Sequence, residues 1–159
     1  MLHSDVDRVI AIADSLTQAP HWAREMYETA VRAGSAPRRI ALVAEDESGT
    51  IVGFAVASMV LPEAELETIG VAVGRQRRGV GRRLLDEIGR SIQAWGATRV
   101  ILEVRKSNGA ARSLYRVAGF EETGLRPGYY ADPKEDAVIM HRALAGGRAS
   151  RLEEGLDSE

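Results

Sequence analysis

Apolar positions recur along this chain with two different periods, and the change of period predicts where helices and strands alternate. In two early segments, which begin at Ser4 and near Pro20, apolar residues are three and four positions apart, as on one face of a helix. Later, alternating or continuous apolar runs bounded by turn residues predict strands. The strand candidates are residues 39–44, 51–61, 65–73, 99–104, 120–124 and 137–142, and the later helix candidates are residues 81–95 and 108–117.

This order predicts an α/β protein with one mixed sheet and helices on both of its faces. Residues 46–49 (Asp-Glu-Ser-Gly) are expected to turn two strands into a hairpin. Residues 129–133 (Tyr-Tyr-Ala-Asp-Pro) are expected to form a loop between the last two strands. Residues 1–145 are predicted to form a single domain, and residues 146–159, rich in Gly, Ser, Arg and Glu, a disordered tail.

Composition narrows the classes of function. With 159 residues, 45% hydrophobic and 28% charged, the chain can bury a sizeable core and is typical of a soluble globular protein. Its net charge of −2 gives no indication of a nucleic-acid partner. The absence of cysteine excludes disulfides and thiol nucleophiles, and the three scattered histidines form no zinc motif, so no metal is expected. No apolar run is long enough to span a membrane and no signal pattern opens the chain, which predicts a cytoplasmic protein with no membrane partner.

The most informative stretch is Gln76-Arg77-Arg78-Gly79-Val80-Gly81-Arg82-Arg83, which lies between a predicted strand and a predicted helix. Glycine permits a positive φ and a close approach of the backbone to a ligand. A helix N-terminus offers unpaired N–H groups and a positive dipole end, which suit a phosphate. The stretch lacks both the GxxxxGK[ST] pattern of a Walker loop and the third glycine of a GxGxxG fingerprint. It therefore predicts a pyrophosphate cradle of another kind, and the alternative is a plain turn with a solvated basic face.

Three polar residues follow the cradle in positions that could carry chemistry. Glu103 lies in an apolar strand, near the carboxyl end, where open α/β sheets place their ligands. It is either a partly desolvated general base or an outward-facing carboxylate paired with Arg105 or with a neighbouring strand. Asn108 opens the next helix, where it can cap the helix, bind a ligand amide, or do both. Tyr115, two turns along the same face, is either a proton donor or a core tyrosine.

Other candidates concern the binding of a second substrate. Glu65 and Glu67 alternate onto one face of the strand before the cradle, where they would bind an amine if that face lines a cleft. If the face is exposed to solvent, they are ordinary polar positions. Tyr129 and Tyr130 are expected on a loop, where aromatic rings either grip a substrate or anchor the loop on the core. Trp22, in the second predicted helix, has the same two interpretations.

Several of these motifs together resemble one known family. Residues 76–81 match the Q/RxxGxG/A acetyl-CoA motif, and on this motif the chain resembles the GNAT acyltransferase superfamily. The segments Leu102-Glu103-Val104-Arg105, Ser107-Asn108-Gly109-Ala110-Ala111, Leu114-Tyr115 and Gly119-Phe120 resemble the next block of that family. The segments Arg126-Pro127-Gly128-Tyr129-Tyr130 and Glu135-Asp136-Ala137-Val138-Ile139-Met140 are similar to the ending of its ribosomal-protein-alanine N-acetyltransferase (RimI-type) branch. The resemblance covers residues 51–144 well and the front end loosely.

The resemblance implies a mostly antiparallel central sheet that is splayed where acetyl-CoA binds. Backbone groups of Ile69, Gly70 and Val71 would run alongside the pantetheine arm, and Asn108 would hydrogen-bond the cofactor nearby. The implied pyrophosphate cradle consists of Gln76, Arg77, Arg78, Gly79, Val80, Gly81 and Arg82. Glu103 would take a proton from the α-ammonium of a protein through water, and Tyr115 would protonate the departing coenzyme A thiolate. The residues implied to contact the acceptor are Glu65, Trp22, Tyr129 and Tyr130.

The implied reaction transfers acetyl from acetyl-CoA, as co-substrate and without a metal, to the N-terminal α-amine of a protein. The implied acceptor is a small-subunit ribosomal protein that begins with alanine, and the enzyme is expected to be a monomer or weak dimer. Direct attack of the amine needs no acyl-enzyme, which agrees with the absence of cysteine. The rival hypotheses are a GNAT enzyme for a small-molecule amine or a lysine side chain, and a non-catalytic acyl-CoA-binding module. The chain departs from the family at its start, where Met1-Leu2-His3 leaves almost no room for the usual first strand.

Overall fold

The computed structural model of the protein describes residues 1–145, so the predicted tail at residues 146–159 lies outside the described residues. The helices are α1 (Val6–Ser15), α2 (Arg24–Val31), α3 (Val80–Ala94) and α4 (Gly109–Val117), with short 3-10 turns at His3–Asp5 and Val73–Arg75. The strands are β1 (Arg38–Glu45), β2 (Ile51–Val60), β3 (Glu63–Val71), β4 (Arg99–Arg105), β5 (Glu121–Ala131) and β6 (Lys134–Ala143).

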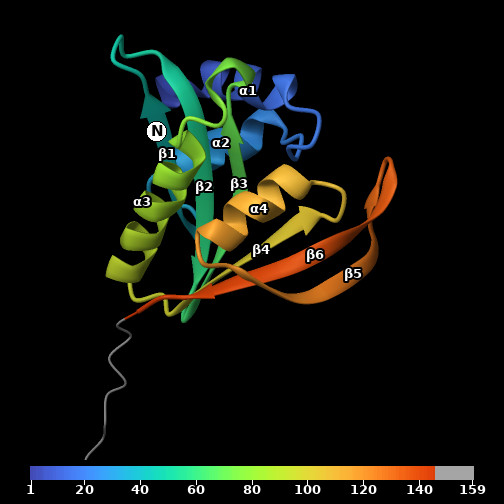
Figure 1. Ribbon diagram of the computed structural model, residues 1–159. Helices are drawn as coiled ribbons and strands as arrows, with labels where there is room; N and C mark the ends of the chain where they lie inside the picture. Colours follow the sequence, from blue (N-terminus) through green and yellow to red (C-terminus); the bar gives the residue numbers. More distant parts are fainter. Residues whose placement is uncertain (146–159) are drawn as a thin grey trace, which may run out of the picture.

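The strands form one sheet in the order β1-β2-β3-β4-β6-β5, with helices on both faces (Figure 1). Every neighbouring pair is antiparallel except β3 and β4, which are parallel. The prediction of a mixed α/β fold with a mostly antiparallel sheet is therefore confirmed. The N-terminus lies beside the first strand, because the amino group of Met1 donates a hydrogen bond to the Ala41 carbonyl oxygen at 3.0 Å.

Two hydrophobic cores hold the helices on the sheet. The larger core packs α3 and α4 on one face, and the predicted stripe of α3 is buried in it through Leu84, Leu85, Ile88 and Ile92. The smaller core packs α1 and α2 on the opposite face against Phe54 of β2. Gly70 of β3 is required by this packing, since a Cβ atom there would lie 2.6 Å from Cε1 of Phe54.

The largest differences from the predicted boundaries are at the start of α2 and the end of β5. Helix α2 begins at Arg24 rather than near Pro20, so Trp22 precedes the helix; its ring packs against Tyr27 at a centroid distance of 5.1 Å. Strand β5 continues to Ala131, so Tyr129 and Tyr130 lie on a strand and the prediction of a loop there was wrong. The reason is that β5 is an edge strand and its pairing with β6 has a bulge between Arg126 and Tyr130, which accommodates Pro127 and Gly128 without ending the strand.

Candidate active site

Strands β3 and β4 separate in the middle of the sheet. They are paired only through Glu63–Arg99, Ala64–Val100 and Glu65–Ile101, and the ion pair between Arg99 and Glu63 closes that end. Beyond these pairs β3 continues to Val71 and β4 to Arg105. The two strands therefore diverge toward their carboxyl ends, and a wedge opens between them that is bounded by α3 and α4.

A bulge in β3 lies at the point where the wedge begins. Val56 of β2 pairs with Thr68, but the next residue, Ala57, pairs with Leu66, so Glu67 is the extra residue. The Thr68 side chain is buried and its hydroxyl has no hydrogen-bond partner among the described residues. The bulge turns the strand locally and so sets the direction of its last residues, Ile69 to Val71, along the wedge.

The Gly-Arg turn forms the N-terminus of α3, as the sequence predicted. Gly79 precedes the helix with φ of +81°, in the left-handed region that favours glycine, and Arg77 has φ of +59°. The Gln76 side chain donates a hydrogen bond to the Val71 carbonyl oxygen at 3.1 Å, which ties the turn to the end of β3. Gly81 faces α4, where an added Cβ would lie 3.0 Å from Cδ2 of Leu114. The first turn of α3 is therefore close to both β3 and α4.

The arginine side chains of this turn do not converge on one point. Arg75 pairs with Asp46 at 2.8 Å, and Arg82 contacts Asp86 at 3.2 Å and the Val117 carbonyl oxygen at 2.8 Å. Arg78 lines an open hollow of about 790 Å³ between α3 and the β1–β2 hairpin. An anion at this turn would therefore be bound mainly by backbone N–H groups, within the positive field of several arginines.

Glu103 lies on β4 with only 17% of its side chain exposed. Its Oε1 atom is 2.9 Å from Nε of Arg126, which is on β5. The interaction of the Tyr129 hydroxyl with Glu103, together with burial, raises the pKa of Tyr129 to about 12. Arg105 is not the partner of Glu103, because Arg105 pairs with Glu135 at 3.4 Å. Glu103 is thus a partly buried carboxylate whose ion-pair partner is Arg126, from the strand beyond β6.

Glu65 and Glu67 lie near Glu103 on the same region of the sheet. Glu67 accepts two hydrogen bonds from Arg39, at 2.7 and 3.1 Å. Partial burial raises the pKa of Glu65, and the neighbouring charges of Glu67 and Glu103 raise it further, against the opposing effect of Arg126. The structure therefore gathers three carboxylates against two guanidinium groups, those of Arg39 and Arg126. Of the three carboxylates, Glu65 has no ion-pair partner within residues 1–145.

Tyr115 and Asn108 lie on α4, above the wedge. Tyr115 is buried, with its ring 5.8 Å from that of Phe120, and burial raises the pKa of its hydroxyl far above the ordinary value. The Asn108 side chain accepts a hydrogen bond from the Ala111 N–H at 3.1 Å, so its expected role as N-cap is confirmed. The cap fixes the first turn of α4 beside the open ends of β3 and β4.

The two tyrosines of β5 have different environments. The Tyr130 ring lies under the guanidinium of Arg105, 4.1 Å from its centre, and packs edge-on against Tyr129 at 5.1 Å. Tyr129 remains half exposed, while its hydroxyl reaches Glu103. Trp22 does not belong to this group, because it packs against the smaller core with Tyr27. The structure thus brings Tyr129 and Tyr130, but not Trp22, into contact with the carboxylate region.

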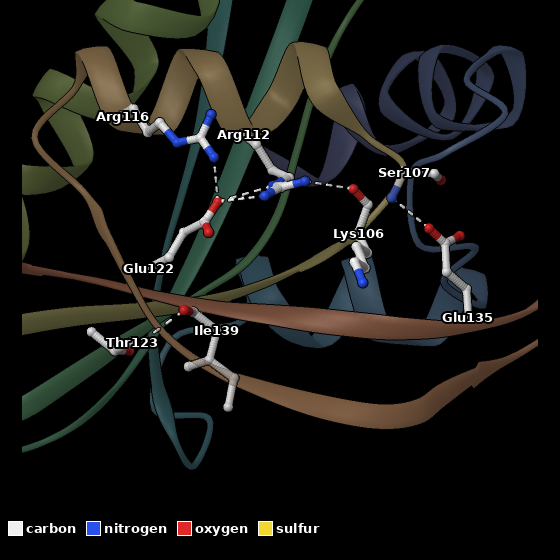
Figure 2. Close-up of polar contacts among 8 residues, drawn as sticks. All are labelled: Lys106, Ser107, Arg112, Arg116, Glu122, Thr123, Glu135 and Ile139. Atoms are coloured by element: carbon white, nitrogen blue, oxygen red, sulfur yellow. Dashed lines mark hydrogen bonds and ion pairs between the residues drawn. The ribbon is translucent and has the colours of Figure 1, made fainter.

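Polar contacts hold α4 and the loop before it against the β5–β6 hairpin. Figure 2 shows Glu122 accepting hydrogen bonds from Arg112 and Arg116 of α4, while Arg112 also donates to the Lys106 carbonyl oxygen at 2.8 Å. Glu135 accepts from the Ser107 N–H on the other side of the loop (Figure 2). These contacts fix both ends of the segment that carries Asn108 and Tyr115.

Sequence reasoning missed the roles of Arg39, Arg126 and Glu135. Arg126 and Glu135 lie in segments that resemble the family, but no local pattern shows which carboxylate or loop each one contacts. The partners meet only through the order of strands, in which β6 lies between β4 and β5. Within residues 1–145 no helix is long and apolar enough to cross a membrane, and no group of three or more His, Asp or Glu side chains is arranged to hold a metal ion.

The Glu122 cluster makes stability depend on pH in acid. Hydrogen bonds from Arg112 and then Arg116 hold the pKa of Glu122 below its ordinary value. A carboxylate with a lowered folded-state pKa stabilises the fold above its unfolded pKa, near 4.3, and this contribution is lost as pH falls through the folded pKa. We expect Glu122→Gln to lower the melting temperature by up to about 4 °C at pH 7 and to show a shallower decline than wild type between about pH 5 and 3.

Thermal unfolding across that pH range measures both effects. Glu121→Gln, at the neighbouring exposed carboxylate, is the matched control and is expected to keep the wild-type slope. Identical slopes for Glu122→Gln and wild type would contradict the assignment of this pH dependence to the cluster.

Comparison with known proteins identifies the fold. The model of the family described as Acetyltransferase (GNAT) family matches residues 9–120. The crystal structure of the ribosomal-protein-S18-alanine N-acetyltransferase from Escherichia coli is similar, with a TM-score of 0.77, 30% identity, and coverage of 93% of this chain and 94% of that one. Ard1 from Thermoplasma volcanium gives a TM-score of 0.79 at 27% identity, covering 92% and 95% of the two chains.

Sequence relatives extend the comparison. The ribosomal protein bS18-alanine N-acetyltransferase of Escherichia coli (strain K12) is 42% identical over 96 residues, which are 59% of this chain and 65% of that protein. The N-alpha-acetyltransferase RimI of Mycobacterium tuberculosis is 45% identical over 98 residues, which are 59% and 60% of the two chains. The chain therefore spans less than two thirds of the length of the curated relatives it matches.

The family match includes β3, the Gly-Arg turn, β4 and all of α4, so it covers the elements that form the wedge. The likeness to the Escherichia coli structure, at 30% identity over nearly the whole of both chains, extends it to the β5–β6 hairpin. The resemblance seen in the motifs is thus matched by the fold. This chain belongs to the GNAT acetyltransferase family.

Proposed function

We propose that this protein transfers the acetyl group of acetyl-CoA to the N-terminal α-amine of a protein, and that the acceptor is a small-subunit ribosomal protein beginning with alanine. The observation that carries the proposal is the carboxylate group formed by Glu65, Glu67 and Glu103. Three carboxylates against two guanidiniums leave a net negative charge, which favours an incoming ammonium. The relatives from Escherichia coli, which are named as alanine N-acetyltransferases of a ribosomal protein, suggest the acceptor class.

The residues of the wedge fit acetyl-CoA as co-substrate. Because β3 and β4 part after Glu65 and Ile101, the backbone of Ile69, Gly70 and Val71 is available to an extended pantetheine arm, as an added strand would use it. The N-terminus of α3 suits the pyrophosphate, and Asn108 would hydrogen-bond the cofactor from α4. The residues proposed for the cradle are Gln76, Arg77, Arg78, Gly79, Val80, Gly81 and Arg82.

Glu103 is the proposed general base. An α-amino group has a pKa of about 8, so that near neutral pH a modest base is sufficient to supply the free amine. Glu103 would take the proton through a water molecule, with the Tyr129 hydroxyl close to its carboxylate. Glu65, whose pKa is raised, would contribute negative charge to the binding of the ammonium.

Tyr115 is the proposed acid. The free amine attacks the thioester carbonyl carbon, a C–N bond forms, the C–S bond breaks, and the electron pair leaves on sulfur. The raised pKa of Tyr115 keeps its hydroxyl protonated, so it is a hydrogen-bond donor to the departing thiolate. A thiol has an ordinary pKa near 8.5, which is below the raised pKa of Tyr115. The Tyr115 hydroxyl therefore first stabilises the departing thiolate by donating a hydrogen bond to it, and transfer of the proton follows.

A coenzyme A release assay with three acceptors tests the proposal. The acceptors are a peptide that begins with alanine, the same peptide with a blocked N-terminus and an internal lysine, and a polyamine. We expect turnover only with the free alanine terminus. Turnover with the blocked peptide or the polyamine would show that the acceptor is a side-chain or small-molecule amine. The assignment of the co-substrate would then stand, and the proposed acceptor would be wrong. Binding of acetyl-CoA without turnover of any acceptor would favour a binding module.

A further inference from the structure

Arg126 occupies the place in which an acceptor ammonium would approach Glu103. Its Nε atom lies 2.9 Å from Oε1 of Glu103, so the two side chains form a close ion pair. A cationic amine bound at this carboxylate, directly or through one water, would compete for the same oxygen. A guanidinium therefore stands where the proposed reaction requires the substrate ammonium.

The contact is made across an intervening strand. Arg126 is on β5 and Glu103 is on β4, with β6 between them, so the side chain spans two strand spacings of about 4.8 Å each. Arg126 pairs in register with Ala137 of β6, and Glu103 pairs with Ile139. Ala137 is a small residue, which leaves room for the arginine to cross β6 diagonally toward Glu103.

The two partners differ in how easily they can return to water. The Arg126 side chain is 57% exposed, whereas that of Glu103 is 17% exposed. An exposed partner makes such a pair weak, since water can replace the contact on that side. The Arg126 guanidinium also lies 5.7 Å from the centre of the Tyr129 ring, over which it can remain when it leaves the carboxylate. Arg126 is therefore the partner that moves.

We propose that Arg126 is a displaceable counter-ion that competes with the acceptor for Glu103 and promotes release of the neutral product. This inference rests on the proposed function. Before an acceptor binds, Arg126 neutralises Glu103, and an arriving α-ammonium exchanges one cation for another. Acetylation converts the ammonium to an amide without charge, so the amide holds the carboxylate less well and Arg126 returns. Arg126 thus competes with every ligand that takes its place at Glu103, acceptor and product alike.

The test compares Arg126→Gln with wild type in two measurements. The first is the KM of the alanine-terminated peptide, and the second is the Ki of the same peptide in its N-acetylated form. Because a competing internal cation lowers apparent affinity in proportion to its occupancy, we expect both constants to fall about two- to fivefold in the variant, while kcat does not rise. Arg126→Lys keeps the charge and is expected to restore wild-type values.

The control is Arg116→Gln, which removes an equally exposed arginine from an ion pair with Glu122 outside the carboxylate group. Because Arg116 also helps to hold the segment that carries Tyr115, a second control is Arg90→Gln, which removes an exposed arginine from an ion pair with Glu87 on α3 and is expected to leave both constants unchanged. A rise or no change in either constant for Arg126→Gln would overturn the proposal, since a residue that binds or merely supports the acceptor gives that result. If Arg126→Gln fails to fold, Arg126→Met, which keeps the aliphatic stem, carries the same expectation.

The test of Arg126 does not depend on which amine is the acceptor. The ratio between variant and wild type can be measured with whichever amine the wild-type protein acetylates, together with its acetylated product. If the wild type acetylates a polyamine and not the peptide, the proposed acceptor fails, yet the two- to fivefold ratio still decides whether Arg126 is a displaceable counter-ion.

Discussion

Replacing Glu103 with glutamine is expected to lower kcat by about two to four orders of magnitude, while acetyl-CoA binds as in wild type. Glutamine has nearly the same shape and can still accept the hydrogen bond from Tyr129, but it cannot take a proton from the acceptor amine. Glu103 lies on β4 at the wedge and not at the Gly-Arg turn, so the cradle is left intact. Steady-state coenzyme A release and calorimetry with acetyl-CoA measure the two properties separately.

Two further variants make the result specific. Glu87→Gln, at a carboxylate in a surface pair with Arg90 on α3, is the matched control and is expected to keep wild-type turnover. Glu65→Gln is expected to raise the KM of the acceptor more than it lowers kcat, because Glu65 adds negative charge beside Glu67 and Glu103, and its pKa is raised by burial and then by those two charges. Normal turnover in Glu103→Gln would show that another group is the base. Glu65 would then be the next candidate, since Glu67 is held by two hydrogen bonds from Arg39.

Features that depend on local sequence could be predicted well. The apolar stripe of α3 fixed both its length and its buried face, because residues three and four apart must share one side of a helix. The positive φ of Gly79 and the capping contact of Asn108 follow from the residue types at a strand-to-helix junction and at a helix start. Each of these features is decided within a few residues of chain.

Features that depend on strand order could not be predicted in this way. Pro127 and Gly128 normally interrupt a strand, yet β5 continues past them, because β5 is an edge strand and a bulge between Arg126 and Tyr130 takes these residues out of its ladder with β6. The Arg126–Glu103 pair exists only because β6 is inserted between β4 and β5. Helix α2 starts at Arg24 although proline favours a first helical turn, and Trp22 lies before the helix with its ring against Tyr27.

Replacing Gly81 with valine is expected to weaken acetyl-CoA binding by about one to two orders of magnitude. Gly81 lies in the first turn of α3, and a Cβ atom there would approach Leu114 of α4 to 3.0 Å and Val71 of β3 to 3.8 Å. A β-branched side chain adds two more carbons in the space between these elements, where the backbone must stay open to a pyrophosphate. The expected loss of affinity corresponds to about 1.4–2.8 kcal/mol of binding free energy.

Gly74→Ala is the control, because a Cβ atom at Gly74 meets nothing within 4 Å and the substitution tests only the loss of a glycine near the same turn. The double variant Gly81→Val with Leu114→Ala then separates two causes. If the affinity returns when Leu114 is shortened, the single variant acted by pushing α4 away from α3. If the affinity stays low, the valine blocks the ligand itself, as a cradle made of backbone N–H groups requires. An unchanged dissociation constant in Gly81→Val would place the pyrophosphate elsewhere, because no ligand can approach the start of α3 closely and ignore a branched side chain at that point.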